Sequence, residues 1–114
     1  IRFCQSNLLE NCHEQFDLIA ANLPYIPTST LKELAVARFE PLLALDGGEN
    51  GLDFISKLLT QSPNRLRPGG MIILEIEANQ SEDVQQLAKN SFPHAQITLL
   101  TDLANHPRIL KIQV

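Results

Sequence analysis

The feature that most constrains the fold of this chain is a short apolar run, residues 16–21, that ends abruptly at Asn22. Six residues of this apolar content, preceded by polar residues, are typical of a buried parallel β-strand. Pro24 and Pro27 exclude a helix directly after the run, because proline lacks an amide donor and restricts the residue before it. The sequence therefore predicts a strand that places Asn22 on a rigid loop at its carboxyl end.

Periodic apolar residues divide the rest of the chain into helix-like and strand-like segments. Spacing typical of an amphipathic face predicts three helices, over residues 29–39, 50–61 and 81–92. β-Branched and alternating apolar residues predict three further strands, over residues 71–76, 96–100 and 108–114. The opening residues 1–4 are also strand-like, and the glycine-containing segments 46–48 and 67–70 predict turns. We expect Ser81 to cap the third helix, because a serine side chain accepts from free amides at a helix start.

The order of these segments is that of an α/β fold, an open and mostly parallel sheet with a C-terminal antiparallel strand pair. A single domain spanning residues 1–114 is expected, since 44% hydrophobic and 19% charged residues are typical of a globular chain. Thirteen acidic residues outnumber nine basic ones, which disfavours direct binding to a nucleic acid backbone. The longest apolar stretch is far shorter than the roughly 20 residues that span a bilayer, so no membrane association is expected.

The cysteines give a further expectation about the cellular setting. Cys4 and Cys12 lie near one end of the sequence without a secretory leader, which favours a reduced, cytoplasmic location. Together with His13 they lack a fourth ligand at suitable spacing, so no metal site is expected.

The tetrapeptide after the first strand, Asn22-Leu23-Pro24-Tyr25, carries the clearest chemical signal. It lies where ligands bind in open α/β sheets, outside the carboxyl ends of the strands. It resembles the Asn-Pro-Pro-Tyr signature of class I methyltransferases that act on planar NH2 groups, with leucine in place of the first proline. The form Asn-Leu-Pro-Tyr is also that of ribosomal RNA adenine dimethyltransferases, so the tetrapeptide by itself leaves both substrate classes open.

The flanking sequence favours one of these classes. It is similar to the protein-glutamine methyltransferases of release factors over nearly the whole chain. The similar segments are residues 26–27, 40–41, 44–48, 51–53, 66–70, 74–76, 80, 102–103 and 108. The resemblance implies a partial class I, Rossmann-like methyltransferase sheet and an enzyme that N-methylates a glutamine side-chain amide. Its implied partner is a peptide chain release factor, with nucleic acid contacts only through a ribosome-associated partner.

The resemblance also implies a role for each residue of the motif. An amide nitrogen is a poor nucleophile, so its orientation must supply much of the catalysis. The Asn22 side-chain oxygen and the Leu23 carbonyl are expected to accept the two N–H hydrogens of the target, while Tyr25 packs on its flat face. The implied catalytic residues are Asn22, Leu23, Pro24 and Tyr25. The implied substrate-binding residues are Asn22, Pro24, Tyr25, Ile26, Pro27 and Glu40.

The cofactor that the resemblance implies is S-adenosyl-L-methionine. Asn7 and Leu8 lie in a segment similar to one beside the cofactor's adenine, and are expected to contact it together with Asn22. The family's Gly-rich cofactor loop precedes this segment and has no counterpart in the sequence. We therefore expect the C-terminal portion of a methyltransferase catalytic domain, with weak or no cofactor binding of its own. Its exposed sheet edges are expected to allow two copies to pair.

Two other interpretations remain open from the sequence. The first is adenine N-methylation of RNA, which the acidic balance of the chain disfavours. The second is a non-catalytic fragment that retains the fold and partner binding without turnover, which the missing cofactor loop favours for the isolated chain.

Overall fold

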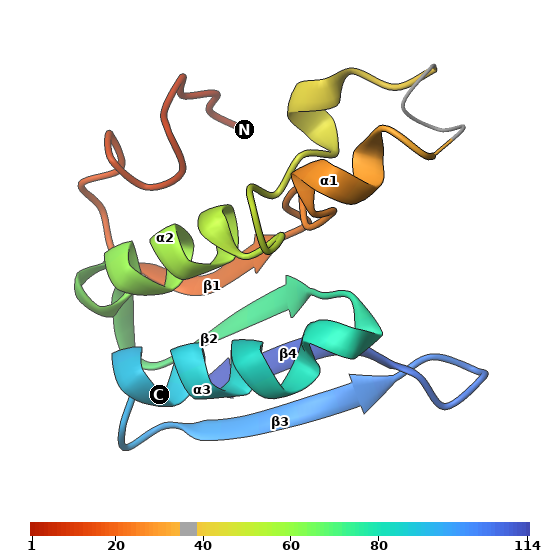
Figure 1. Ribbon diagram of the computed structural model, residues 1–114. Helices are drawn as coiled ribbons and strands as arrows, with labels where there is room; N and C mark the ends of the chain where they lie inside the picture. The colour runs from red at the N-terminus through yellow and green to blue at the C-terminus, as the bar shows by residue number, and fades with distance from the viewer. Residues whose placement is uncertain (35–38) are drawn as a thin grey trace.

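The computed structural model describes residues 1–34 and 39–114, and its elements follow the predicted order (Figure 1). The strands of this described part are β1 (Phe16–Ala21), β2 (Leu66–Glu75), β3 (Gln96–Thr101) and β4 (Pro107–Gln113). The α-helices are α1 (Thr28–Leu31), α2 (Asp53–Gln61) and α3 (Ser81–Ser91). Short 3-10 turns are η2 (Leu42–Ala44), η3 (Pro63–Arg65) and η4 (Ala78–Gln80).

The strands form one sheet in the order β1-β2-β4-β3. β1 runs parallel to β2, with Ile19 opposite Ile72, and β4 runs antiparallel to both β2 and β3. The predicted α/β class and the predicted C-terminal antiparallel pair are confirmed. Within the described strands the parallel part of the sheet is the pair β1–β2, whose carboxyl ends lie at the same edge.

The core lies between one face of the sheet and the helices α2 and α3, which pack side by side over it (Figure 1). Side chains alternate along a strand, so every second residue of β1, β2 and β4 points to this face. The buried residues at this interface are Ile19, Ile72, Leu74, Leu110 and Ile112 from the strands and Ile55, Leu58, Leu59, Val84 and Ala88 from the helices. Each fully buried Leu or Ile contributes roughly 1.5–3 kcal/mol, so this layer fixes the register of β1 against β2.

The segment before β1 packs against α2 rather than joining the sheet. The Leu9 amide donates to the Gln61 side-chain oxygen at 2.8 Å, and the Lys57 ammonium lies 2.6 Å from the Glu10 carboxylate. Leu8 and Leu9 contact the edge of the core. None of the described helices has the length and apolarity that crossing a bilayer requires.

Two predicted segments differ from the structure. Residues 1–4 form no strand, and Ile1 and Phe3 are exposed. The prediction was wrong because an apolar run becomes a strand only beside a pairing edge, which local pattern does not specify. The helix predicted over residues 29–39 is reduced to α1 followed by a turn, and its positions 35–38 lie outside the described residues.

Element boundaries shift where glycines or turns intervene. α2 begins at Asp53 instead of residue 50, because Gly48 and Gly51 adopt positive φ values of 89° and 72°. Ser81 lies in the first turn of α3 and makes no capping hydrogen bond, so its predicted capping role is wrong; η4 runs directly into α3. The predicted turn at 67–70 belongs to β2 as an irregular stretch, across which the pairing with β1 shifts.

Candidate functional site

The motif forms a pocket at the carboxyl end of β1. Ala21, the last residue of β1, pairs with Leu74, so residues 22 and 75 leave the two parallel strands at the same edge. Residues 22–26 turn across this edge and, with residues 44 and 45, line a pocket of about 180 Å³. Pockets for drug-sized ligands measure about 300–1,000 Å³, so this one suits a single side chain.

Two acceptor oxygens of the motif are available to a ligand in this pocket. Asn22 is exposed, and among the described residues no hydrogen bond involves its side chain or the Leu23 carbonyl oxygen. The Leu23 side chain packs against the core, which anchors the residue while its carbonyl stays free. Pro24 has no amide donor to compete for either oxygen.

The end of the motif loop is held by hydrogen bonds to residues 45–48. The Ile26 amide donates to the Leu45 carbonyl at 3.1 Å, and the Gly47 amide donates to the Ile26 carbonyl at 2.8 Å. The hydroxyl of Thr28 and the amide of Gly48 both donate to the Asp46 carboxylate, at 2.7 and 3.0 Å. These two bonds, chiefly the one from Thr28, hold the pKa of Asp46 below its usual value. The loop is therefore rigid on the side away from β1.

Two glycines allow this close approach of backbone segments. A Cβ added at Gly47 would lie 2.8 Å from the Tyr25 Cα. One added at Gly51 would lie 2.2 Å from the Tyr25 carbonyl oxygen and 2.5 Å from Gln80 Nε2. Gly51 also has φ +72°, which L residues rarely adopt. The conformation of the motif thus depends on the absence of side chains at both positions.

Tyr25 is fixed by a contact with the neighbouring strand. Its hydroxyl donates to Glu75 Oε1 at 3.3 Å, across the edge where β1 and β2 end. Partial burial and then the charge of Glu75 raise the pKa of the Tyr25 phenol above its usual value of about 10. The ring is therefore held neutral and in one orientation beside the pocket.

This shift is directly measurable, because the chain has one tyrosine and no tryptophan. We expect the tyrosinate absorbance of the folded chain to appear at higher pH than that of the chain in denaturant. Glu75→Gln removes the nearby charge and should move the folded midpoint part of the way back. The stabilising contribution of neutral Tyr25 is fully present below about pH 10 and is lost as the pH rises through the folded pKa. Equal midpoints for folded and unfolded chain would contradict this placement of Tyr25.

Ion pairs tie the end of β2 to the β3–β4 hairpin beside this site. Arg108 Nη1 lies 3.3 Å from the Glu77 carboxylate, and Arg108 Nε lies 3.7 Å from that of Asp102. Asp102 also accepts the amides of His106 and Ala104, and the bond from His106 contributes most to lowering the pKa of Asp102. These contacts hold the segment after Glu75 in place.

The predicted site residues do not all gather at the pocket. Asn22, Leu23, Pro24, Tyr25 and Ile26 line it together, whereas Pro27 lines a neighbouring one. Glu40 is exposed and is not part of the pocket wall. Asn7 and Leu8 lie in a turn before β1, and no hydrogen bond among the described residues links them to the motif.

Sequence reasoning did not assign four residues that the structure places at the motif. Ala44 and Leu45 line the pocket, Glu75 binds the Tyr25 hydroxyl, and Gln80 binds the Tyr25 carbonyl. Glu75 was detectable, because it directly follows the predicted strand that runs parallel to β1 and so shares the ligand-binding edge. The other three lie in segments that resemble the family, but the resemblance assigned them no role.

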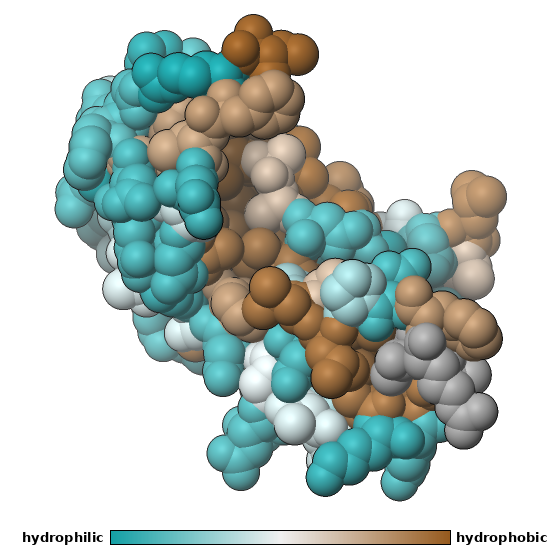
Figure 2. Space-filling model, turned by 90° about the horizontal axis from the view of Figure 1, so that it is seen from above, coloured by the Kyte–Doolittle hydropathy of each residue, from teal (hydrophilic) through white to brown (hydrophobic). Residues whose placement is uncertain are grey.

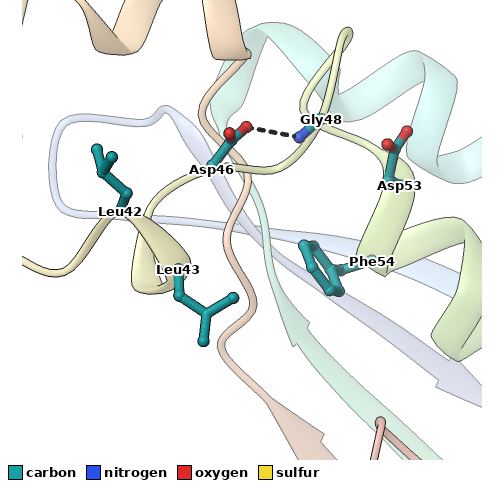
Figure 3. A pocket seen from close by; sticks show the side chains of 6 residues that line it. All are labelled: Leu42, Leu43, Asp46, Gly48, Asp53 and Phe54. Carbon is teal, nitrogen blue, oxygen red and sulfur yellow. Dashed lines mark hydrogen bonds between the residues drawn. The ribbon is translucent and has the colours of Figure 1, made fainter.

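A further cavity of about 360 Å³ is lined by residues on either side of Ala44 and Leu45, which line the motif pocket (Figure 3). It is lined by Leu42, Leu43, Asp46, Gly48, Asp53 and Phe54. Leu42 and Leu43 are 60% and 83% exposed. The view from above in Figure 2 shows apolar side chains gathered around a hollow in the surface. The motif pocket therefore has a partly apolar surface beside it.

Relatives of known name align with most of this chain. No family model matches the chain. The release factor glutamine methyltransferase of Bacillus cereus is 34% identical to it over 115 residues, which cover 96% of this chain and 41% of that protein. The chain thus spans less than half the length of this relative.

Solved structures share the fold. The protein-(glutamine-N5) methyltransferase of Alicyclobacillus acidocaldarius, described as release factor-specific, is similar with a TM-score of 0.59 and 21% identity, over 87% of this chain and 48% of that one. The E. cuniculi Mtq2–Trm112 complex, responsible for methylation of the eRF1 translation termination factor, gives a TM-score of 0.62 and 20% identity, over 96% and 59%. At these identities the likeness establishes the fold.

Proposed function

Because this chain belongs to the release factor glutamine methyltransferase family, we propose that it supplies the target-amide site of an enzyme that methylates a glutamine side chain in a peptide chain release factor. One arrangement carries the proposal. The Asn22 side-chain oxygen and the Leu23 carbonyl oxygen lie on one short loop at a side-chain-sized pocket, and neither has a partner in the described chain. A primary amide presents two N–H donors, which two such acceptors match.

These acceptors act by orientation. The lone pair of an amide nitrogen is delocalised, so it attacks only when the nitrogen is held with that lone pair toward the methyl donor. S-adenosylmethionine supplies the methyl group as a sulfonium. The nitrogen would gain a bond to the methyl carbon as the carbon–sulfur bond of the sulfonium breaks and leaves its electron pair on sulfur. The Asn22 and Leu23 oxygens stabilise the positive charge that develops on the nitrogen. The extra proton then leaves to solvent, because the Asn22 amide has no basic form at neutral pH.

Tyr25 contributes a flat surface for the amide. Its ring lines the pocket, and the bond from its hydroxyl to Glu75 keeps the ring from rotating away. Ring-face packing suits the plane of an amide group. Pro27 and the exposed Glu40 stay proposed contacts of the release factor.

The motif pocket does not fit the whole cofactor, since about 180 Å³ is below the size of a nucleoside-binding pocket. We propose that Asn7 and Leu8 contact its adenine, which the exposed Asn7 side chain supports, and that its other contacts come from outside these 114 residues. Both cysteines are free thiols, in keeping with a cytoplasmic enzyme. Pairing of two copies through exposed sheet edges stays a prediction.

The test combines binding with product analysis. We expect calorimetry to detect S-adenosylmethionine binding by the protein at its natural length and weak or no binding by the 114-residue chain. With a purified release factor and methyl-labelled cofactor, peptide mass spectrometry should locate the label on a glutamine side-chain nitrogen. Ribosomal RNA is tested as a second substrate in a parallel assay with the same labelled cofactor. Label in its adenines with none in the release factor would favour the RNA alternative and overturn the proposal.

A further inference from the structure

The side chain of Gln80 hydrogen-bonds both the motif and the loop before α2. It is 7% exposed and lies at the junction of η4 and α3. Its Nε2 donates to the Tyr25 carbonyl oxygen at 3.0 Å and to the Asn50 carbonyl oxygen at 3.2 Å. One side-chain NH2 group therefore holds two loops that are far apart in the sequence.

The orientation of this side chain follows from its partners. Both neighbours are carbonyl oxygens, which accept and never donate, so the NH2 end of the amide must face them. The opposite end, Oε1, is buried and has no hydrogen-bond partner in the described chain. A buried acceptor without a partner costs free energy that an apolar side chain of the same length would avoid. This points to the two donated hydrogen bonds, rather than to packing, as the role of Gln80.

The Tyr25 carbonyl is well placed to control the catalytic acceptors. On one side of the motif, Ala21 is held in the sheet by its pairing with Leu74. On the other, Gln80 holds Tyr25. Only residues 22–24 lie between these two anchors, and Pro24 has a fixed φ. The positions of the Asn22 and Leu23 oxygens are set by where the anchors stand.

We propose that Gln80 is a positioning residue, which holds the Tyr25 carbonyl so that the Asn22 and Leu23 oxygens meet both N–H groups of the target amide. This proposal rests on the proposed function, which assigns the Asn22 and Leu23 oxygens to the target amide. Gln80 touches neither the target nor the cofactor, and acts through the backbone of the motif.

The decisive variants are Gln80→Met and Gln80→Glu in the protein at its natural length. Methionine has similar length and no donor, so the motif loses its anchor. We expect kcat to fall by about 10-fold to 100-fold, as for a small misplacement of reacting groups, with KM for the cofactor nearly unchanged. The matched control is Gln86→Met, on the exposed side of α3, whose amide donates to the Asn90 side chain and to no other residue that the structure describes. It should leave kcat unchanged.

The glutamate variant gives a readout that a packing role would not produce. Ionised, it places a carboxylate against two carbonyl oxygens; protonated, it donates one O–H to one of them. Relative to the original protein, Gln80→Glu should therefore recover activity as the pH falls through the pKa of the new carboxyl. Gln80→Met should show a constant ratio. The same pH-independent loss in both variants, or an unchanged kcat in Gln80→Met, would overturn the inference.

A second measurement is independent of catalysis. Hydrogen exchange, followed by mass spectrometry over residues 22–28, should be about 10-fold faster or more in Gln80→Met than in Gln86→Met. Faster exchange in an enzyme that methylates no glutamine would reject the proposed function while keeping Gln80 as the anchor of the loop. Unchanged exchange in an active enzyme would reject Gln80 and leave the proposed function intact.

Discussion

Replacing Asn22 with alanine should abolish nearly all methyl transfer while leaving the chain folded. The substitution removes one of the two acceptors that we propose to orient the target nitrogen and stabilise its developing charge. Loss of one such preorganised group costs about 100-fold to 1,000-fold in kcat. Because Asn22 is exposed and its side chain makes no hydrogen bond in the described chain, unfolding free energy should change by only about 0.5 kcal/mol or less.

The measurement is methyl transfer to the release factor beside thermal unfolding of the same preparation. Asn64→Ala is a matched control, since Asn64 is also exposed but lies in η3, at the opposite end of β2 from the motif. It should keep full activity. Turnover of Asn22→Ala near that of the control would remove the role assigned to Asn22.

Gly51→Ala is expected to be the most destabilising single substitution at the site. Its new methyl group would overlap the Tyr25 carbonyl oxygen and the Gln80 amide, at 2.2 and 2.5 Å. A positive φ in an L residue costs about 1–2 kcal/mol, and forced overpacking costs a further 1–3 kcal/mol or so. A total of about 2–5 kcal/mol is a large part of the roughly 5–15 kcal/mol that stabilises a domain.

A control substitution at Gly69 separates the backbone cost of a positive φ from the cost of overpacking. It has a similar φ of +77°, but a Cβ added there would meet no atom within 4 Å. Gly69→Ala should therefore show the backbone cost alone, and urea unfolding of both variants gives the difference. If Gly51→Ala were no less stable than Gly69→Ala, the close contact between Gly51, Tyr25 and Gln80 would not exist in solution.

The place of Asn22 was predictable because every signal for it is local. An apolar run ends, two prolines follow, and the carboxyl end of a parallel strand is where open α/β sheets bind ligands. The same holds for α3 and for the antiparallel pair β3–β4, whose apolar periodicity is regular. Local patterns misled at residues 1–4, where no sheet edge pairs with a strand-like run, and at Ser81, where a preceding turn replaces the cap.

The supports of the motif were not predictable in this way. The contact between Gln80 and Tyr25 joins residues that are distant in sequence, and a glutamine at the start of a helix is ordinarily a solvated residue. Gly51 looks like a simple turn glycine until the carbonyl it faces is known. Side-chain roles that depend on a tertiary neighbour leave no periodic trace in a single sequence.

The parallel pairing of β1 with β2 has a consequence for how the chain folds. The β3–β4 hairpin closes a short loop, with Leu99 opposite Leu110, whereas β1 must find a strand that begins more than forty residues further along. Closing the longer loop loses more chain entropy and is slower. During synthesis β1 emerges as an apolar segment and stays unpaired until β2 has left the ribosome. We therefore expect the β1–β2 pairing, which brings Asn22 to the edge beside Glu75, to form more slowly than the β3–β4 hairpin.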